Sequence, residues 1–163
     1  ASHAGVTVDL VGPVVPPAFK QELESAAEGT PATLVGSVSR AEVGTRLANA
    51  RASFVLFHPA PNHTNAQPNK LFESMSAGVP VIASDFPAWR RIVDGEQCGL
   101  LVDPLDSQAI AHAMTWLLEH HEDAEAMGRR GRQAVEQRYN WESESTRLID
   151  LYASLERGDP VVM

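Results

Sequence analysis

The stretch from Pro68 to Ser84 (PNKLFESMSAGVPVIAS) constrains the fold more than any other part of the chain. Its first half begins with a proline and ends at Gly78, which is typical of a short helix. Its second half, from Val79 to Ala83, is an apolar run of the kind found in strands that are buried on both faces. A helix that continues directly into such a strand predicts a parallel α/β sheet.

The rest of the chain repeats this alternation of apolar runs and helical patterns. Ser39 begins a capping-box match (SRAE), and Asp106 and Asn140 are good N-caps for later helices. The sequence therefore predicts an α/β fold, a Rossmann-like parallel sheet of about five strands with helices on both faces and a C-terminal helical segment. We expect strands at about 6–11, 32–35, 53–57, 79–83 and 99–102, a loop at 58–67, and helices at about 16–28, 39–50, 68–77, 88–93, 106–120, 122–138 and 141–155.

Length and charge limit the classes of protein to which the chain can belong. Its 163 residues suit one domain, which we expect at 1–156 with a tail at 157–163. The net charge of -8 argues against a general nucleic-acid or membrane-surface binder. The single cysteine, Cys98, lies in an apolar run and predicts a small core residue, and it fits a reducing compartment.

Lys70 is the only basic residue between Pro68 and Ser84, and it falls in the first turn of the predicted helix. A cation there opposes the helix dipole, whose N-terminal end is already positive. The placement is understandable if an anion such as a phosphate binds in front of the helix, where free N–H groups also point. The alternative is that Lys70 and Glu73 form an ordinary surface pair, worth only about 0.2–0.5 kcal/mol.

Several short motifs, taken together, resemble one known family. These are PNKLFESM at 68–75, AGVPVIAS at 77–84, Gly95, GLLVDP at 99–104, Asp106, Met127-Gly128, Gly131-Arg132 and YNWE at 139–142. The pattern resembles the C-terminal half of family 4 retaining glycosyltransferases of GT-B architecture, which binds the nucleotide-sugar donor. The resemblance runs from about 6 to 155, nearly the whole chain.

The resemblance implies roles for individual residues. Lys70 is implied to contact the diphosphate of the donor and Glu73 to hold its ribose hydroxyls, and these two are the implied catalytic residues. Other donor contacts are implied in the loops after the strands and at the start of the helix, including backbone groups that cap the phosphates: Gly12, Gly36, Val38, Asn65, Pro68, Asn69, Leu71 and Phe72. No metal or other cofactor is implied.

The implied reaction transfers a sugar from a UDP- or GDP-sugar to an acceptor hydroxyl with retention, in the synthesis of cell-surface glycans. The implied partners are the nucleotide-sugar and an N-terminal acceptor domain of the same polypeptide; no nucleic-acid partner is expected. Compared with the family, the opening strand and the acceptor half are absent, so we expect the chain to be inactive alone. Any peripheral association with a membrane would involve the absent half.

One departure from the family keeps other functions open. The family carries two acidic residues eight positions apart, and the first of them falls on Asn65 in this chain. An amide can still form a hydrogen bond to a sugar hydroxyl, but Asn65 is equally well explained as a loop residue that tolerates an unusual backbone angle. The alternatives are therefore a non-catalytic nucleotide-binding or scaffold relative and a sugar-nucleotide epimerase.

Three further side chains have competing explanations. His58 and His63 stand in the expected loop without a nearby acidic or cysteine ligand, so they are interpreted as loop histidines, either of which could contact a sugar, rather than a metal site. Trp89 follows the strand end at Ser84, where core packing and stacking on a sugar are both reasonable.

Overall fold

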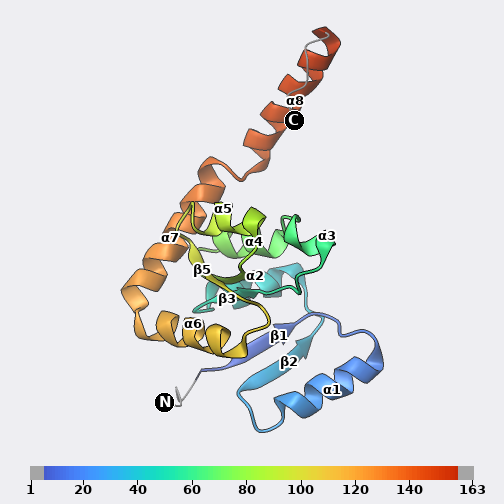
Figure 1. Cartoon of the computed structure of the whole chain (residues 1–163), viewed down its shortest axis with the longest axis vertical. Helices are drawn as coiled ribbons and strands as arrows, with labels where there is room; N and C mark the ends of the chain where they lie inside the picture. Colours follow the sequence, from blue (N-terminus) through green and yellow to red (C-terminus); the bar gives the residue numbers. More distant parts are fainter. Residues whose placement is uncertain (1–5, 158–163) are drawn as a thin grey trace. The chain divides into compact units, whose positions relative to one another are not determined.

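The computed structural model describes residues 6–157, and the chain divides into two compact units, Ala1–Arg46 and Leu47–Met163 (Figure 1). Each unit is described by itself. The described elements, in chain order, are β1 (Val8–Val11), α1 (Pro17–Ala27), β2 (Ala32–Gly36), α2 (Arg40–Ala48), β3 (Ser53–Val55), α3 (Pro61–Thr64), α4 (Asn69–Ser76), β4 (Val81–Ser84), α5 (Pro87–Val93), β5 (Gly99–Val102), α6 (Ser107–Glu119), α7 (His121–Gln137) and α8 (Trp141–Arg157).

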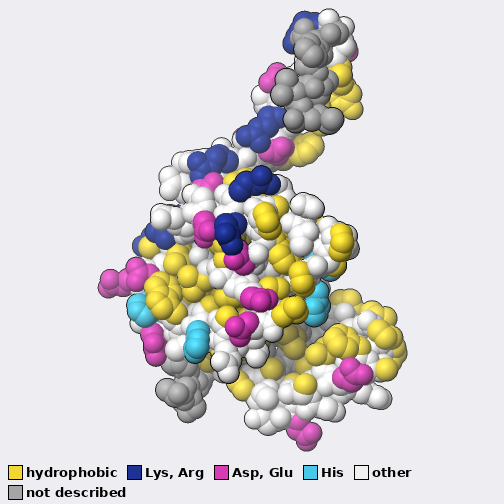
Figure 2. Space-filling view, viewed as in Figure 1, with side chains coloured by type: hydrophobic (Ala, Val, Ile, Leu, Met, Phe, Trp, Pro, Cys, Tyr) yellow, Lys and Arg dark blue, Asp and Glu magenta, His cyan; other side chains and the backbone are white. Residues whose placement is uncertain are grey.

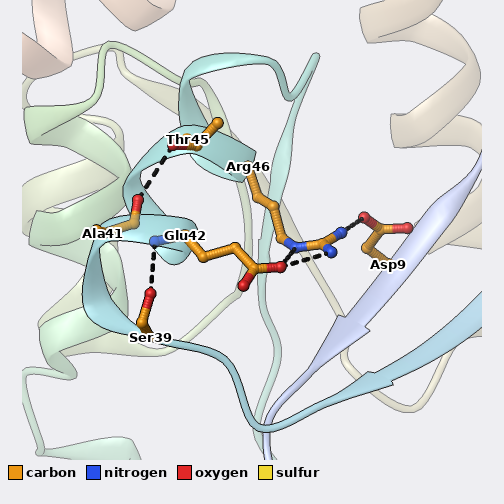
Figure 3. A network of polar contacts seen from close by, with 6 residues as sticks. All are labelled: Asp9, Ser39, Ala41, Glu42, Thr45 and Arg46. Carbon is orange, nitrogen blue, oxygen red and sulfur yellow. Dashed lines mark hydrogen bonds and ion pairs between the residues drawn. The ribbon is translucent and has the colours of Figure 1, made fainter.

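A polar network in the first unit connects α2 to β1, which pairs in parallel with β2. The Arg46 guanidinium donates to the Asp9 carboxylate at 2.6 Å and to Glu42 at 3.0 Å (Figure 3). The backbone N–H of Glu42 donates to the Ser39 hydroxyl at 3.2 Å, so the predicted cap by Ser39 is confirmed. The network fixes one side chain of α2 against the middle of β1.

The second unit is built on a parallel three-stranded sheet in the order β3-β4-β5. Val55, Val81 and Ala83 pack on one face with α4, α5 and the end of α7. Ile82 and Val102 pack on the other face with α6 and the beginning of α7. The central strand β4 is therefore covered by helices on both sides.

Two glycines allow α7 to approach α4 and the chain around Gly78 very closely. A Cβ atom added at Gly128 would lie 2.0 Å from the carbonyl oxygen of Gly78. A Cβ atom at Gly131 would lie 3.1 Å from the Cβ of Cys98 and 3.4 Å from the Cγ of Met75. Burial at this contact raises the pKa of the Cys98 thiol to about 11, which agrees with the prediction of a core cysteine.

The α/β class, the parallel strands and the helices on both faces are confirmed, with the strands divided into sheets of two and three. The predicted strand at 99–102 and the caps by Asp106 and Asn140 are also confirmed. The prediction of an uninterrupted loop at 58–67 was wrong, because Pro61 begins the short helix α3; proline has the backbone φ of a first helical residue and no N–H to satisfy there. The predicted tail lies outside the described residues except for Arg157, which ends α8.

The C-terminal helix α8 buries none of its residues. Hydrophobic groups are visible on one side of this helix in Figure 2. The large apolar side chains that are exposed along it are Trp141, Leu148, Ile149, Leu151, Tyr152 and Leu155. Among the described residues, no helix combines the length and the hydropathy needed to cross a bilayer.

We expect the substitution Gly128→Ala to destabilise the second unit by about 1–3 kcal/mol, because the added methyl group meets a backbone oxygen that cannot rotate away. Urea unfolding followed by tryptophan fluorescence measures this unit alone, since Trp89, Trp116 and Trp141 all lie in it. The reference is the wild-type chain, measured in the same way. An unfolding midpoint of Gly128→Ala equal to that of the wild type would contradict the close approach of α7 to the chain at Gly78.

Candidate functional site

The backbone N–H groups in the first turn of α4 donate no hydrogen bond to a capping side chain. Its N-cap residue, Pro68, is extended, with φ of -73° and ψ of 134°, and offers no side-chain acceptor. The first turn contains no acidic residue, and the side chains of Asn69 and Lys70 are exposed. The N-terminus of α4 is therefore a positive helix end that carries an additional cation.

The ammonium group of Lys70 lies over an aromatic ring instead of beside a carboxylate. Its Nζ atom is 5.5 Å from the centroid of the Phe57 ring, within the range of a cation–π interaction. No ion pair in the described part of the chain involves Lys70 or Glu73. The surface pair considered from the sequence is not formed in this structure.

The backbone of Phe57 is fixed by a single buried hydroxyl group. The Ser84 Oγ atom accepts from the Phe57 N–H at 2.9 Å and donates to the Phe57 carbonyl at 3.1 Å. Ser84 is fully buried at the carboxyl end of β4. The two hydrogen bonds attach the residue beneath Lys70 to the central strand of the sheet.

Two more rings hold the loop beside Phe57. His63 and Trp89 contact the Phe57 ring edge to face, with centroids 5.0 and 5.5 Å away. The Nε1–H of Trp89 donates to the carbonyl of Ala66 at 2.6 Å, and a hydrogen bond of 3.0 Å joins His63 Nδ1 to the carbonyl of His58. Because Trp89 is only 1% exposed, its role is packing and not stacking on a sugar.

The residues predicted between Asn65 and Glu73 are brought together at this end of α4, but their side chains differ in access. Asn65, Asn69, Lys70 and Glu73 are exposed. Leu71 has a fully buried side chain, so only its backbone is left for a donor contact.

Phe72 takes part in local packing, and Asn65 has an ordinary backbone conformation. Phe72 is half-buried, and its ring lies 5.3 Å from that of Tyr139. Asn65 has φ of -108°, so the unusual backbone angle considered for it is not used.

Gly12, Gly36 and Val38 belong to the first unit, at the ends of β1 and β2. The N–H of Gly12 donates to the carbonyl of Gly36 at 2.9 Å, and both glycines have positive φ, 137° and 76°. Val38 follows β2 and is half-buried. These residues lie at the carboxyl edge of their own sheet, which is where ligands bind in parallel α/β folds.

Sequence reasoning missed the residues that support Lys70, namely Phe57, Ser84 and Ser74. The hydroxyl of Ser74 in α4 is hydrogen-bonded to the carbonyl of Lys70 and to the hydroxyl of Ser53, both at 2.8 Å. The sequence did contain one signal, the polar Ser84 at the end of an otherwise apolar strand. A hydroxyl group that is buried there needs hydrogen-bond partners from a neighbouring segment.

Curated relatives align with about half of the chain. It is 36% identical over 85 residues to a phosphatidyl-myo-inositol mannosyltransferase of Mycobacterium leprae, over 52% of this chain and 22% of that protein. It is 34% identical over 87 residues to a GDP-mannose-dependent alpha-(1-6)-phosphatidylinositol monomannoside mannosyltransferase of Mycobacterium tuberculosis, over 53% of this chain and 22% of that one. The matched part of this chain thus covers about a fifth of the length of these relatives.

Solved structures match over nearly the whole chain. Sucrose-phosphate synthase from Thermosynechococcus elongatus superposes with a TM-score of 0.78 at 28% identity, over 93% of this chain and 39% of that one. Anabaena Alr3699/HepE in complex with UDP-glucose superposes with a TM-score of 0.78 at 18% identity, over 91% of this chain and 41% of that one, and this likeness shows the fold alone. The fold is that of one half of a GT-B glycosyltransferase.

The family itself is shown by the sequence. The family model described as "Glycosyl transferases group 1" matches residues 1–120. The match covers both sheets and all but the last two helices, and it confirms the resemblance on which the site predictions rest. The chain belongs to the group 1 glycosyltransferase family.

Proposed function

We propose that this chain binds a nucleoside-diphosphate sugar and that, in the whole protein, the sugar is transferred to an acceptor hydroxyl with retention. The observation that carries the proposal is the ammonium group of Lys70, which stands at the uncapped positive end of α4 without a carboxylate partner among the described residues. A diphosphate is the ligand that this combination favours, because it supplies the negative charge that the helix end lacks.

The same groups would assist the reaction. Negative charge develops on the diphosphate as the bond to the sugar breaks, and donors that are already fixed in place stabilise it. Lys70 and the first amides of α4 would supply these donors without a metal ion. Glu73, three residues further on the helix, would accept hydrogen bonds from the ribose hydroxyls, and Asn65 would contact the sugar through its amide.

The names of related proteins support this class of donor and acceptor. Anabaena Alr3699/HepE is described in complexes with UDP and with UDP-glucose, whereas one mycobacterial relative is described as GDP-mannose-dependent. We therefore keep both UDP- and GDP-sugars as donors. The two mycobacterial relatives are named for phosphatidyl-myo-inositol and for a phosphatidylinositol monomannoside, which supports a role in cell-surface glycan synthesis. We propose that the reaction takes place in the cytoplasm.

We propose that activity requires a second half that binds the acceptor. The matched structures are much longer than this chain, which covers 39% and 41% of them. The exposed apolar side chains of α8 support the presence of a further packing partner. Closure of two halves around the donor would complete the site, so we expect no transfer by this chain alone.

Asn65 supports one alternative, in which the protein binds a nucleotide but catalyses no reaction. The amide brings no charge to the position where the family carries an acid. Consumption of UDP-glucose or GDP-mannose by the full-length protein, measured with its acceptor present, separates the two functions. Nucleotide binding without any consumption would favour the non-catalytic alternative.

We expect the substitution Lys70→Ala to weaken the binding of UDP or GDP to this chain by roughly tenfold or more, because a hydrogen bond between charged groups contributes about 1.5–3 kcal/mol. Isothermal titration calorimetry measures the dissociation constant. The matched control is Lys20→Ala, which removes the other lysine of the chain, paired with Glu24 in α1. Equal affinities for Lys70→Ala and the wild type would remove the diphosphate assignment.

A separate prediction concerns the contact between Glu73 and the ribose hydroxyls of the donor. The wild type should bind UDP more tightly than 2′-deoxy-UDP, and Glu73→Gln should reduce this difference, because the charged acceptor is lost while the side chain keeps its length. Four titrations, two proteins with two ligands, give the coupling between the side chain and the hydroxyl group. The control is Glu96→Gln, at a carboxylate bound by Arg138 and Tyr139. A Glu73→Gln variant that keeps the full preference for UDP would exclude the ribose contact.

A further inference from the structure

We propose that Phe57 is a positioning residue of the donor site, whose ring holds the ammonium group of Lys70 in place before the nucleotide binds. The inference rests on the proposed function, because it assigns a supporting residue to the same diphosphate contact. No motif of the sequence pointed to Phe57.

The geometry places the ring directly beneath the cation. The Lys70 Nζ atom lies 5.5 Å from the ring centroid, and the negative face of an aromatic ring attracts a cation at this distance. An exposed lysine without such a contact loses the rotational freedom of several side-chain bonds when it binds a ligand, and this loss of conformational entropy weakens binding. A ring that already limits these rotations reduces that cost, and the affinity for the anion rises.

The ring can perform this role because it is itself fixed. The Ser84 hydroxyl binds both the N–H and the carbonyl of Phe57, and Ser84 is fully buried. His63 and Trp89 pack edge to face against the same ring. Trp89 in turn is buried and bound to the carbonyl of Ala66, so the support extends into the core and into the adjacent loop.

An aromatic ring also has an advantage over a carboxylate at this position. A carboxylate would hold Lys70 more strongly, but it would repel the incoming diphosphate and would have to be displaced. The ring attracts the ammonium without cancelling its charge, so Lys70 remains available to the anion. The carboxylate of Asp85, which follows Ser84 in the chain, accepts hydrogen bonds of 2.9 and 2.6 Å from the Arg90 guanidinium. Glu73 forms no ion pair among the described residues.

The test changes the electrostatics of the ring with little change in its shape. Replacing Phe57 by 3,4,5-trifluorophenylalanine removes most of the negative charge from the ring face. We expect the affinity for UDP, or for GDP if it binds more tightly, to fall about two- to fivefold, the range that an exposed cation–π contact provides. The matched control is the same replacement at Phe54 in β3, which packs against the other face of the sheet.

The chain contains only two lysines, Lys20 and Lys70, so NMR of selectively labelled lysine side chains gives a direct second measurement. The ring current of Phe57 should shift the Lys70 side-chain protons upfield relative to those of Lys20, and Phe57→Leu should abolish this shift while Phe57→Tyr keeps it. Addition of nucleotide should perturb Lys70 and leave Lys20 unchanged.

The outcomes separate the inference from the proposed function. If Lys70→Ala weakens nucleotide binding while the fluorinated Phe57 and Phe57→Leu bind as the wild type does, the role of Phe57 is wrong and the donor site stands. If Lys70→Ala has no effect, the donor site is wrong and the inference falls with it. Lysine signals that show no ring-current shift at Lys70 would overturn the inference independently of any binding measurement.

Discussion

The complete burial of β4 is the constraint from which most of the second unit follows. All four residues of this strand are buried, and three of them are apolar. The fourth, Ser84, brings a hydroxyl group into the interior, where an unpaired polar group is costly. The backbone of Phe57 provides both a donor and an acceptor for it. A requirement of the core therefore fixes the residue that lies beneath Lys70.

The same constraint explains why the site can hold a cation at the positive end of a helix. Lys70 is unfavourable there by the helix dipole alone. The ring of Phe57 compensates part of this cost and leaves the charge of the ammonium group in place. The backbone of Lys70 is held as well, because the Ser74 hydroxyl donates a hydrogen bond to the Lys70 carbonyl and Ser74 is almost fully buried. The cation is thus held by groups that belong to the core.

Much of the fold was predictable because it depends on local patterns. The run from Val79 to Ala83 predicted a buried strand, and Asp106 and Asn140 predicted the starts of two helices through their side-chain acceptors. The short helix at Pro61 was missed, since a single turn has too few residues to show a helical period. The first and last residues of strands also shifted; β4 begins at Val81, after a proline that has no N–H to donate to a neighbouring strand.

Local sequence patterns were sufficient for most of the elements, for the cation in the first turn of α4 and for the family to which these motifs belong. The contacts between distant residues became known from the folded chain. Phe57 and not Glu73 lies next to Lys70, and Trp89 serves as packing. Gly128 lets α7 touch the chain at Gly78. The physical reason is that helices, strands and caps depend on neighbours along the chain, whose spacing is written in the sequence. Contacts between distant residues depend on which surfaces fit together once water is excluded, and no local period records that fit.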